Sequence, residues 1–441
     1  MNSKLTSPWW WIPTLYFAEG IPYFIVNNIS VIMFTRMGVP NETMALYTGL
    51  LYLPWTIKPL WSPFVDILKT KRWWILSMQL LMTAAFVALT LTIPRPTPEM
   101  IAAKGTPVSL FTVTLLLFTL TAFASATHDI AADGFYMLAL NPGEQSMFVG
   151  IRSTFYRISS VFGQGVLVFV AGMLERSTGN IPLAWRITLL VTALIFALIT
   201  IYHSFIVPRP AEDTPRLAAE SKGKAKEIAR EFIAAFGTYF QKKGIVAALL
   251  FMVLFRFPEA LTLKLVTPFL LDAPEAGGLG LSTETVGIVY GTIGVIALTI
   301  GGIVGGIALA KWGLKKSLLP MALAVALPCF VYVYMSVCHP ASLVVISSCL
   351  AFEQFGYGFG FTAYMLYMIY FSTGGFKTSH YAICTAFMAL SMMLPGMIAG
   401  YIWKWVGGYT PFFWVVMLSC LLTVAVTFAV KVDPEFGKKI K

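Results

Sequence analysis

Apolar stretches long enough to cross a lipid bilayer recur along almost the whole chain. A helix that spans a membrane needs about 20 consecutive, mostly apolar residues. Hydrophobic residues make up 58% of the 441 residues and charged residues only 12%, whereas soluble domains carry roughly 25% charged residues. A soluble fold could not cover so much apolar surface, so the sequence predicts an all-α integral membrane protein.

These apolar runs are separated by short polar loops and by one longer polar stretch near the middle. The predicted transmembrane helices, twelve in all, cover residues 10–36, 43–68, 72–93, 108–140, 146–174, 182–207, 243–271, 283–310, 315–337, 341–371, 377–404 and 409–430. The expected organisation is an N-terminal six-helix half over 1–207, a cytoplasmic linker over 208–242 and a C-terminal six-helix half over 243–441.

The second part of the linker has a helical apolar face. Its spacing places Ile228, Phe232, Ala235 or Phe236, and Tyr239 on one helical face, with Lys and Glu elsewhere. This pattern predicts an amphipathic helix that lies on the membrane surface. A solvated linker without membrane contact is the alternative interpretation.

Lys and Arg are unevenly divided between alternate loops, which is the pattern that sets the orientation of membrane proteins. With the N-terminus placed inside, the linker is strongly basic and the other inner segments carry Lys69, Lys71, Arg72, Lys311, Lys315, Lys316, Lys377, Lys431, Lys438, Lys439 and Lys441. The outer loops carry only Arg95, Lys104 and Arg176. We therefore expect both termini in the cytoplasm. The net charge of +11 reflects this topology and not a nucleic-acid partner.

Two basic loops occupy matching positions in the two halves. The loop over 62–72 contains Asp66, Lys71 and Arg72, and the loop over 306–316 contains Gly306, Gly313, Lys315 and Lys316. Both resemble degraded copies of the acidic and basic glycine loop of the major facilitator superfamily. An acid at a helix end can meet cations in such a turn and hold one conformation. The predicted gating or structural residues are therefore Asp66, Lys71, Arg72, Arg152, Lys315 and Lys316.

Ionisable residues inside the predicted membrane spans are the main candidates for function, because charges in hydrocarbon are costly. At about 1.5 Å of rise per helical residue, four charges lie at one depth, about 15 Å from the cytoplasmic side: Glu19, Lys58, Asp129 and Arg157. Asp133 and Arg152 form a second matched pair nearer the cytoplasm. We expect the four to bind solute or to couple protons, whereas an ion pair with a structural or gating role is the alternative for Asp133.

Further candidates lie beside these positions and in the second half. His128 precedes Asp129, and a simple hydrogen-bonded helix residue is its alternative interpretation. Arg256 and Glu259 are three residues apart on the seventh helix and could neutralise each other. Glu353 lies on the tenth helix. The candidate substrate-binding or proton-coupling residues are thus Glu19, Lys58, His128, Asp129, Asp133, Arg157, Arg256, Glu259 and Glu353.

Other chemistry finds little support in the sequence. The five cysteines contain no CxxC pair and predict neither a disulfide framework nor a metal site. No cofactor is expected, and the spacing of Ser, His and Asp gives no catalytic triad. A membrane-embedded enzyme and a sensor that binds a solute without moving it are therefore remote alternatives to a transporter.

Several of these segments resemble the muropeptide permease (AmpG) branch of the major facilitator superfamily. The matching stretches are residues 16–22, 58–66, 128–133, 144–163, 256–260, 353–360 and 375–382. The resemblance implies a bacterial inner-membrane importer of N-acetylglucosaminyl-1,6-anhydro-N-acetylmuramic acid and its peptides, driven by protons. It carries over Lys58, Asp129, Asp133, Arg157, Glu259 and Glu353 as functional candidates. The branch often has Gln at the position of His128, and some members carry two further helices.

The expected mechanism is alternating access, in which two halves rock about a central site. Lys58, Arg157 and Arg256 would attract an anionic or hydroxyl-rich solute. A carboxylate among Glu19, Asp129, Glu259 and Glu353 would take up a proton outside and release it inside. The chain is expected to work as a monomer in lipid. Carriage of siderophores, drugs or an acyl carrier such as acetyl-CoA, in either direction, is the main alternative.

Overall fold

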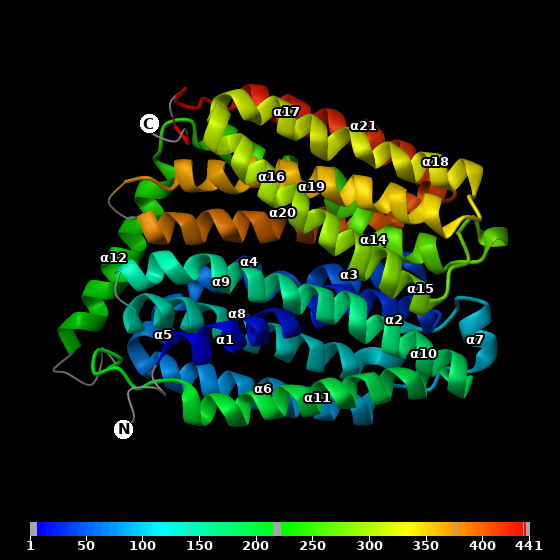
Figure 1. Cartoon of the computed structure of the whole chain (residues 1–441), viewed down its shortest axis with the longest axis horizontal. Helices are drawn as coiled ribbons and strands as arrows, with labels where there is room; N and C mark the ends of the chain where they lie inside the picture. Colours follow the sequence, from blue (N-terminus) through cyan, green and yellow to red (C-terminus); the bar gives the residue numbers. More distant parts are fainter. Residues whose placement is uncertain (1–6, 141, 215–221, 375–376, 435, 438–441) are drawn as a thin grey trace.

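Long helices that run side by side build the whole protein (Figure 1). The computed structural model describes residues 7–140, 142–214, 222–374, 377–434 and 436–437. No strand occurs in this described part. The beginning of the first helix and the end of the last lie at the same end of the molecule, here called the termini end (Figure 1). The opposite end is called the far end. The first of the predicted spans ends there at Arg36, and the seventh ends there at Leu271.

The first half consists of α1 (Pro8–Phe24), η2 (Ile25–Ile29), α2 (Ser30–Arg36), α3 (Asn41–Leu50), α4 (Leu53–Ile57), η3 (Lys58–Leu60), α5 (Ser62–Leu68), α6 (Lys71–Thr92), α7 (Pro98–Ala102), η4 (Val108–Phe111), α8 (Thr112–Ala139), α9 (Pro142–Ser160), η5 (Val161–Leu167), α10 (Val168–Thr178) and α11 (Ile181–Ile206). The helix α12 (Lys222–Phe240) follows. The second half consists of α13 (Ile245–Leu254), α14 (Phe257–Leu271), η7 (Pro274–Ala276), α15 (Thr283–Ile288), η8 (Val289–Gly294), α16 (Val295–Trp312), α17 (Leu314–Ala326), η9 (Leu327–Cys329), α18 (Phe330–Cys338), α19 (Leu343–Phe371), α20 (Lys377–Val406) and α21 (Tyr409–Ala429).

The predicted second span, 43–68, is broken into pieces. Eleven helices of the described part are long and apolar enough to cross a membrane as continuous elements. The segment from Asn41 to Leu68 is instead divided into α3, α4, η3 and α5. Pro54, Pro59 and Pro63 each stand in the first turn of one of the later pieces. Proline suits a first helical turn but breaks an established helix, so these residues explain where the span is interrupted.

Among the residues that the structure describes, three helices contain a wider π-helical turn near the middle of the molecule. These turns are η2 after α1, η5 after α9 and η8 after α15. The turns η5 and η8 touch across the two halves, because a Cβ atom added at Gly291 would lie 1.8 Å from the backbone oxygen of Gln164. Glycine at this position therefore allows the two helices to approach backbone to backbone.

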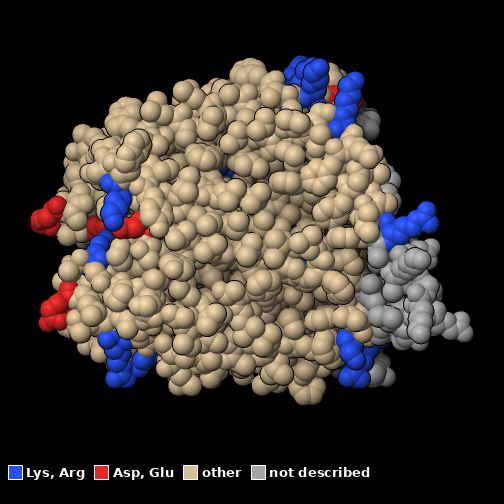
Figure 2. All heavy atoms as spheres, turned by 180° about the vertical axis from the view of Figure 1, so that it is seen from behind, with Lys and Arg blue, Asp and Glu red and all other residues tan. Residues whose placement is uncertain are grey.

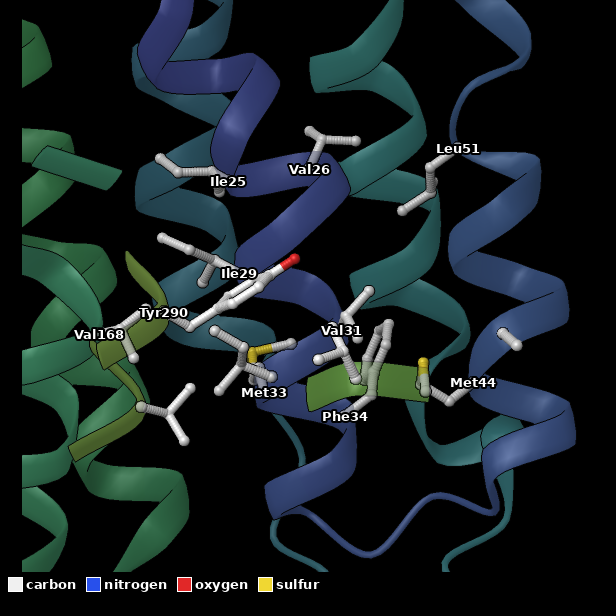
Figure 3. Packing of buried hydrophobic residues seen from close by; sticks show 14 of the residues in the cluster. Ile25, Val26, Ile29, Val31, Met33, Phe34, Met44, Leu51, Val168 and Tyr290 are labelled. Atoms are coloured by element: carbon white, nitrogen blue, oxygen red, sulfur yellow. The ribbon is translucent and has the colours of Figure 1, made fainter. Parts of the chain in front are cut away.

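A large hydrophobic core joins the two halves toward the far end, and a smaller one joins Tyr52 to Ala260, Met392 and Met393. The large core contains residues of the first half, such as Ile29 and Val168, and residues of the second half, such as Tyr290 and Phe269. Figure 3 shows the Tyr290 side chain among residues of the first half, close to Ile29. The far end is therefore closed by packing between the halves.

The halves have separate cores toward the termini end. Trp11, Phe135 and Phe148 belong to a core built from the first half alone. Phe251 and Tyr364 belong to another core, built from the second half together with α12. Packing across the halves is thus most extensive at the far end, and it continues where α4 and η3 contact α20.

The surface carries its charges at the two ends. Figure 2 shows Lys, Arg, Asp and Glu gathered at both ends of one face, with a broad band of other residues between them. Many large apolar side chains are exposed on the helices, among them Leu91, Phe205, Ile307 and Trp405. A band of this kind matches the hydrocarbon layer of a bilayer.

The linker helix packs against protein. Of the predicted apolar face, Ala235 and Tyr239 are buried against the second half, and Tyr239 Oη lies 3.4 Å from Cys384 Sγ on α20. The side chain of Ile228 lies outside the described residues. This part of the face therefore contacts α20, and the domain boundaries at 207 and 242 remain predictions.

Candidate functional site

Asp133 and Arg152 form the predicted ion pair. Arg152 Nη2 donates to Asp133 Oδ1 at 2.7 Å, and Tyr16 Oη donates to the same oxygen at 3.2 Å. The guanidinium also stacks over the rings of Tyr16 and Tyr136, at 4.5 and 5.0 Å from their centroids. The Asp133 side chain is 45% exposed and that of Arg152 is 29% exposed. The pair is therefore open to solvent although it lies within long helices.

Asp129 lies one turn further from the termini end on α8. Trp55 Nε1 of α4 donates to Asp129 Oδ2 at 3.1 Å, and Lys58 of η3 lies within electrostatic range of the same carboxylate. The breaks in the second span thus direct an indole N–H and an ammonium group at one acid of α8. An acid, a cation and a donor are brought together, as the common depth of Lys58 and Asp129 predicts.

Glu19 completes this cluster from α1. It is buried, and its Oε2 atom has no hydrogen-bond partner among the described residues. Its electrostatic neighbours are Asp129, Asp133, Lys58 and Arg152. A buried carboxylate without a donor is costly, and a proton removes that cost. Glu19 is therefore a group whose protonation can respond to changes in its surroundings.

Arg157 does not join this cluster, although the sequence places it at the same depth. Its guanidinium lies against Gly302 of α16, where an added Cβ atom would be 3.2 Å from Nη2. Tyr357 of α19 is its electrostatic neighbour, and it has no ion-pair partner among the described residues. Arg157 thus reaches from the first half to the second.

His128 points away from Asp129, into the interior of the first half. Its Nε2 atom lies 3.0 Å from Gln79 Nε2, and Gln79 Oε1 lies 3.0 Å from His203 Nδ1. His203 Nε2 contacts Thr14 Oγ1 at 2.9 Å. The side chains of Gln79, His128 and His203 are fully buried. The chain of contacts joins α8, α6, α11 and α1, so the structure favours the hydrogen-bonded alternative for His128.

Arg256 and Glu259 form a bidentate pair between α13 and α14. The Arg256 Nε and Nη2 atoms each lie 2.9 Å from a Glu259 carboxylate oxygen, and Nη2 also donates to Tyr357 Oη at 2.7 Å. The guanidinium lies 4.8 Å from the Phe361 ring centroid. Fork-shaped pairs of this kind are strong and directional. Since Tyr357 also neighbours Arg157, this tyrosine connects both cations.

Glu353 is buried on α19 inside the second half. Its Oε2 atom accepts from Tyr332 Oη at 2.9 Å and from Gln354 Nε2 at 2.8 Å. Glu259 is an electrostatic neighbour. Unlike Glu19, this carboxyl group is held by two neutral donors.

The two basic loops have related contacts at the termini end. In the first, Asp213 accepts from the backbone N–H groups of Lys71 and Arg72 at 2.7 and 3.0 Å, and Arg72 Nε donates to Val207 O at 3.0 Å. In the second, Leu314 N donates to Phe436 O at 2.9 Å. In the first half, the segment after α11 thus contacts the start of α6. In the second half, the segment after α21 contacts the start of α17 in the same way. The predicted Lys315 and Lys316 are exposed, and the Asp66 side chain lies outside the described residues.

Ion pairs at the far end were not predicted from the sequence. Glu175 accepts from Arg36 Nε at 3.0 Å, from Trp185 Nε1 at 3.0 Å and from Thr283 Oγ1 of the second half at 2.7 Å. Nearby contacts between the halves join Arg176 with Glu284, Lys104 with Asp272, and Lys404 with Glu42. Charges near span ends looked like topology markers in the sequence, so their pairing across the halves had no visible signal.

The family follows from the sequence match. Residues 14–374 match the family model of the Major Facilitator Superfamily. The chain belongs to this superfamily. It is a multi-pass membrane transporter with the predicted twelve-helix, two-half fold, and not an enzyme.

Relatives support the predicted branch. The anhydromuropeptide permease of Escherichia coli (strain K12) is 23% identical over 392 residues, which cover 88% of this chain and 72% of the permease. Putative transporter AmpG 4 of Rickettsia conorii is 25% identical over 379 residues, covering 85% of this chain and 84% of that protein. The predicted resemblance to the muropeptide permease family is confirmed.

Solved structures agree on the fold. The D-xylose-proton symporter has a TM-score of 0.70 at 14% identity, with 97% of this chain and 98% of that chain covered. The nucleoside transporter NupG has a TM-score of 0.68 at 15% identity, with 97% of this chain and 98% of that chain covered. At these identities the likeness concerns the fold alone.

Proposed function

We propose that this transporter imports anhydro-muropeptides, or related amino-sugar saccharides, together with protons. Its similarity to the anhydromuropeptide permease of E. coli supports the solute class. The same similarity supports a bacterial inner membrane as the location. The basic segments of the sequence support cytoplasmic termini, and the presence of two halves in one chain supports a single working chain.

The observation that carries the proton coupling is the position of Glu19. A buried carboxyl group with one unpartnered oxygen lies beside Asp129, Lys58 and the Asp133–Arg152 pair. Arrival or departure of a charged solute would change the field at Glu19 and Asp129. A proton can then be exchanged in step with the solute, which is the requirement for a symporter.

The distribution of contacts supports alternating access. The far end is closed by shared packing and by ion pairs, while Asp133 and Arg152 near the termini end are partly exposed. With cytoplasmic termini, this arrangement corresponds to a state that faces the cytoplasm. Import then requires a second state in which the contacts at the far end are broken.

Cationic side chains supply the attraction for the solute. Lys58, Arg157 and Arg256 come from both halves; Lys58 lies near Asp129, and both arginines lie near Tyr357. Sugar rings pack on aromatic faces, and anions bind guanidinium and ammonium groups. This mixture suits a polar, anionic saccharide better than an apolar drug.

Uptake of radiolabelled N-acetylglucosaminyl-1,6-anhydro-N-acetylmuramic acid tests the proposal. The protein is expressed in cells that lack their own permease, and uptake is measured with and without a protonophore. We expect accumulation that the protonophore abolishes. Protein that is expressed and inserted but takes up no saccharide would rule out this solute and favour a siderophore or an acyl carrier.

A further inference from the structure

A narrow cavity lies between the halves, on the far-end side of the charged cluster. Polar side chains from both halves line it, namely Asn27, Asn28, Gln164, Lys264 and Thr267. Tyr52 and Tyr290 add aromatic rings. The contacts of the far end close over it, so the cavity is narrow in this conformation and would widen when the halves separate there.

Lys264 of α14 brings a cation into this cavity. The residue is 3% exposed, and its Nζ atom donates to Thr48 Oγ1 at 3.1 Å. The ammonium also lies 5.1 Å from the centroid of the Tyr52 ring. No carboxylate among the described residues forms an ion pair with it. An ammonium has three donors, and the residues that the structure describes accept from one of them.

Retaining such a cation has an energetic cost. An ion buried without a partner of opposite charge destabilises a fold by several kcal/mol. Intramembrane lysines without a partner commonly serve an ion or substrate pathway. One hydroxyl and one aromatic ring compensate the charge of Lys264 incompletely, so an external anion would complete the site.

A second polar group of the cavity also lacks a partner. Asn27 Oδ1 is buried and forms no hydrogen bond among the described residues, although Asn27 Nδ2 donates to Tyr23 O at 3.2 Å. Asn28 Nδ2, by contrast, is held by Gln164 Oε1 at 3.0 Å. The cavity therefore offers a cation with free donors and one free amide acceptor.

The backbone around the cavity is specialised as well. Asn27, Gln164 and Tyr290 lie on the three π-helical turns η2, η5 and η8. Single π-helical turns occur frequently at functional sites, where they redirect side chains. Three helices from two halves thus present cavity residues from the same unusual backbone geometry.

We propose that Lys264 and Asn27 form a carboxylate subsite for the transported solute. The Lys264 ammonium binds the carboxylate, and Asn27 Oδ1 accepts from a neighbouring hydroxyl or amide N–H of the same molecule. The solute class is an acidic amino sugar with a free lactyl carboxylate, which narrows the proposed solutes to the saccharide without a peptide, because an attached peptide converts this carboxylate to an amide. This inference rests on the proposed function and adds the group of the solute that is recognised.

The test compares two forms of one saccharide. Binding of radiolabelled N-acetylglucosaminyl-1,6-anhydro-N-acetylmuramic acid and of its lactyl carboxamide is measured on the purified full-length protein. We expect the carboxylate form to bind about tenfold more tightly, and Lys264→Met to remove this difference by weakening only the carboxylate form. Lys264→Arg, which retains the cation, should keep part of it. A preference that survives in Lys264→Met overturns the subsite.

The variants also need a control for folding. Lys311→Met changes an exposed lysine at the end of α16 and should bind like the wild type. The melting temperature of Lys264→Met without ligand should equal or exceed that of the wild type, because an incompletely compensated charge is removed. A clear loss of stability, restored by Lys264→Arg, would show that the lysine is structural and would overturn the subsite.

Failure of the proposed function gives a different result. If neither saccharide binds the wild type, the muropeptide assignment is wrong. The subsite is then tested with N-acetylalanine and N-acetylalaninamide by thermal shift. If N-acetylalanine but not its amide stabilises the wild type, and does not stabilise Lys264→Met, the result supports a carboxylate subsite for another solute. The same response of the wild type and Lys264→Met overturns the subsite.

Discussion

Trp55 Nε1 donates a hydrogen bond of 3.1 Å to Asp129 Oδ2 and thereby joins the broken second span to α8. Trp55 is 5% exposed, so the donor cannot be replaced readily by water. The break in the span determines which side chains face Asp129. It directs the Trp55 donor and the Lys58 cation at the carboxyl group of Asp129. A continuous helix would place these two side chains at other angles around the helix axis.

Removing the Trp55 donor should impair transport. Trp55→Phe keeps an aromatic ring but leaves Asp129 without this hydrogen bond, and a bond to a charged group contributes about 1.5–3 kcal/mol. We expect the initial rate of saccharide uptake to fall roughly tenfold or more. Trp61→Phe is the matched control, because Trp61 Nε1 donates to the neutral Thr127 Oγ1 at 3.2 Å. Equal uptake by the two variants would contradict a role for the Trp55 bond.

Neutralising Asp129 should separate accumulation from exchange. Asp129→Asn keeps the shape of the side chain and its contact with Trp55, but it cannot release a proton. We expect proton-driven accumulation to be lost while counterflow of labelled against unlabelled saccharide remains. Glu99→Gln, on the short helix α7, is the control. Uphill accumulation by Asp129→Asn would show that Asp129 does not carry the proton.

The charged cluster could be predicted in part from helical periodicity. Asp129 and Asp133 are four residues apart and share a face of α8, and the depth of Arg152 matched that of Asp133. His128 is adjacent to Asp129 in sequence, but one residue turns an α-helix by about 100°. Its side chain therefore enters the interior of the first half and contacts Gln79.

Contacts between the halves could not be predicted from the same pattern. Depth along a helix does not give its rotation, and the π-helical turn η5 begins four residues after Arg157. Arg157 therefore lies against Gly302, with Tyr357 as its electrostatic neighbour, and does not join Glu19. Lys264 falls within the predicted span 243–271, but the absence of an ion-pair partner among the described residues depends on neighbours from the other half. The ion pairs at the far end could likewise not be predicted, because they depend on how the two halves are placed against each other.

The network around Gln79 should stabilise the first half. Gln79→Leu is similar in volume, but it leaves His128 Nε2 and His203 Nδ1 without a partner. Each buried unsatisfied group costs about 1–3 kcal/mol, so we expect a clearly lower melting temperature of the purified protein. Gln241→Leu, at an exposed turn residue directly after α12, should melt like the wild type. An unchanged melting temperature in Gln79→Leu would mean that the network contributes little.

Glycine at position 291 should be required for the closed far end. A Cβ atom there would lie 1.8 Å from Gln164 O, a backbone atom that cannot move aside alone. Gly291→Ala should therefore separate η5 from η8 and favour the state that is open at the far end. Gly306→Ala is the control, since a Cβ atom there meets nothing within 4 Å. Spin labels introduced at Ser177 and Glu275, both exposed near this end, would report the separation as longer distances.

Glu175 should hold the far end closed through its charge. It binds Arg36 of the first half and Thr283 of the second, and it is almost buried. Glu175→Gln keeps the size of the side chain but weakens the hydrogen bonds that depend on its charge. A loss of about 2 kcal/mol from the closed state would raise the ratio of open to closed molecules roughly thirtyfold.

The same spin-label pair measures this change in the purified protein. We expect the distance distribution of Glu175→Gln to gain a long component that the wild type lacks, while Glu99→Gln leaves the distribution unchanged. Saccharide uptake should fall as well, because a transporter held open at one end completes fewer cycles. If Glu175→Gln keeps the wild-type distances, the shared hydrophobic core closes the far end without help from the ion pairs, and Gly291→Ala alone should then open it.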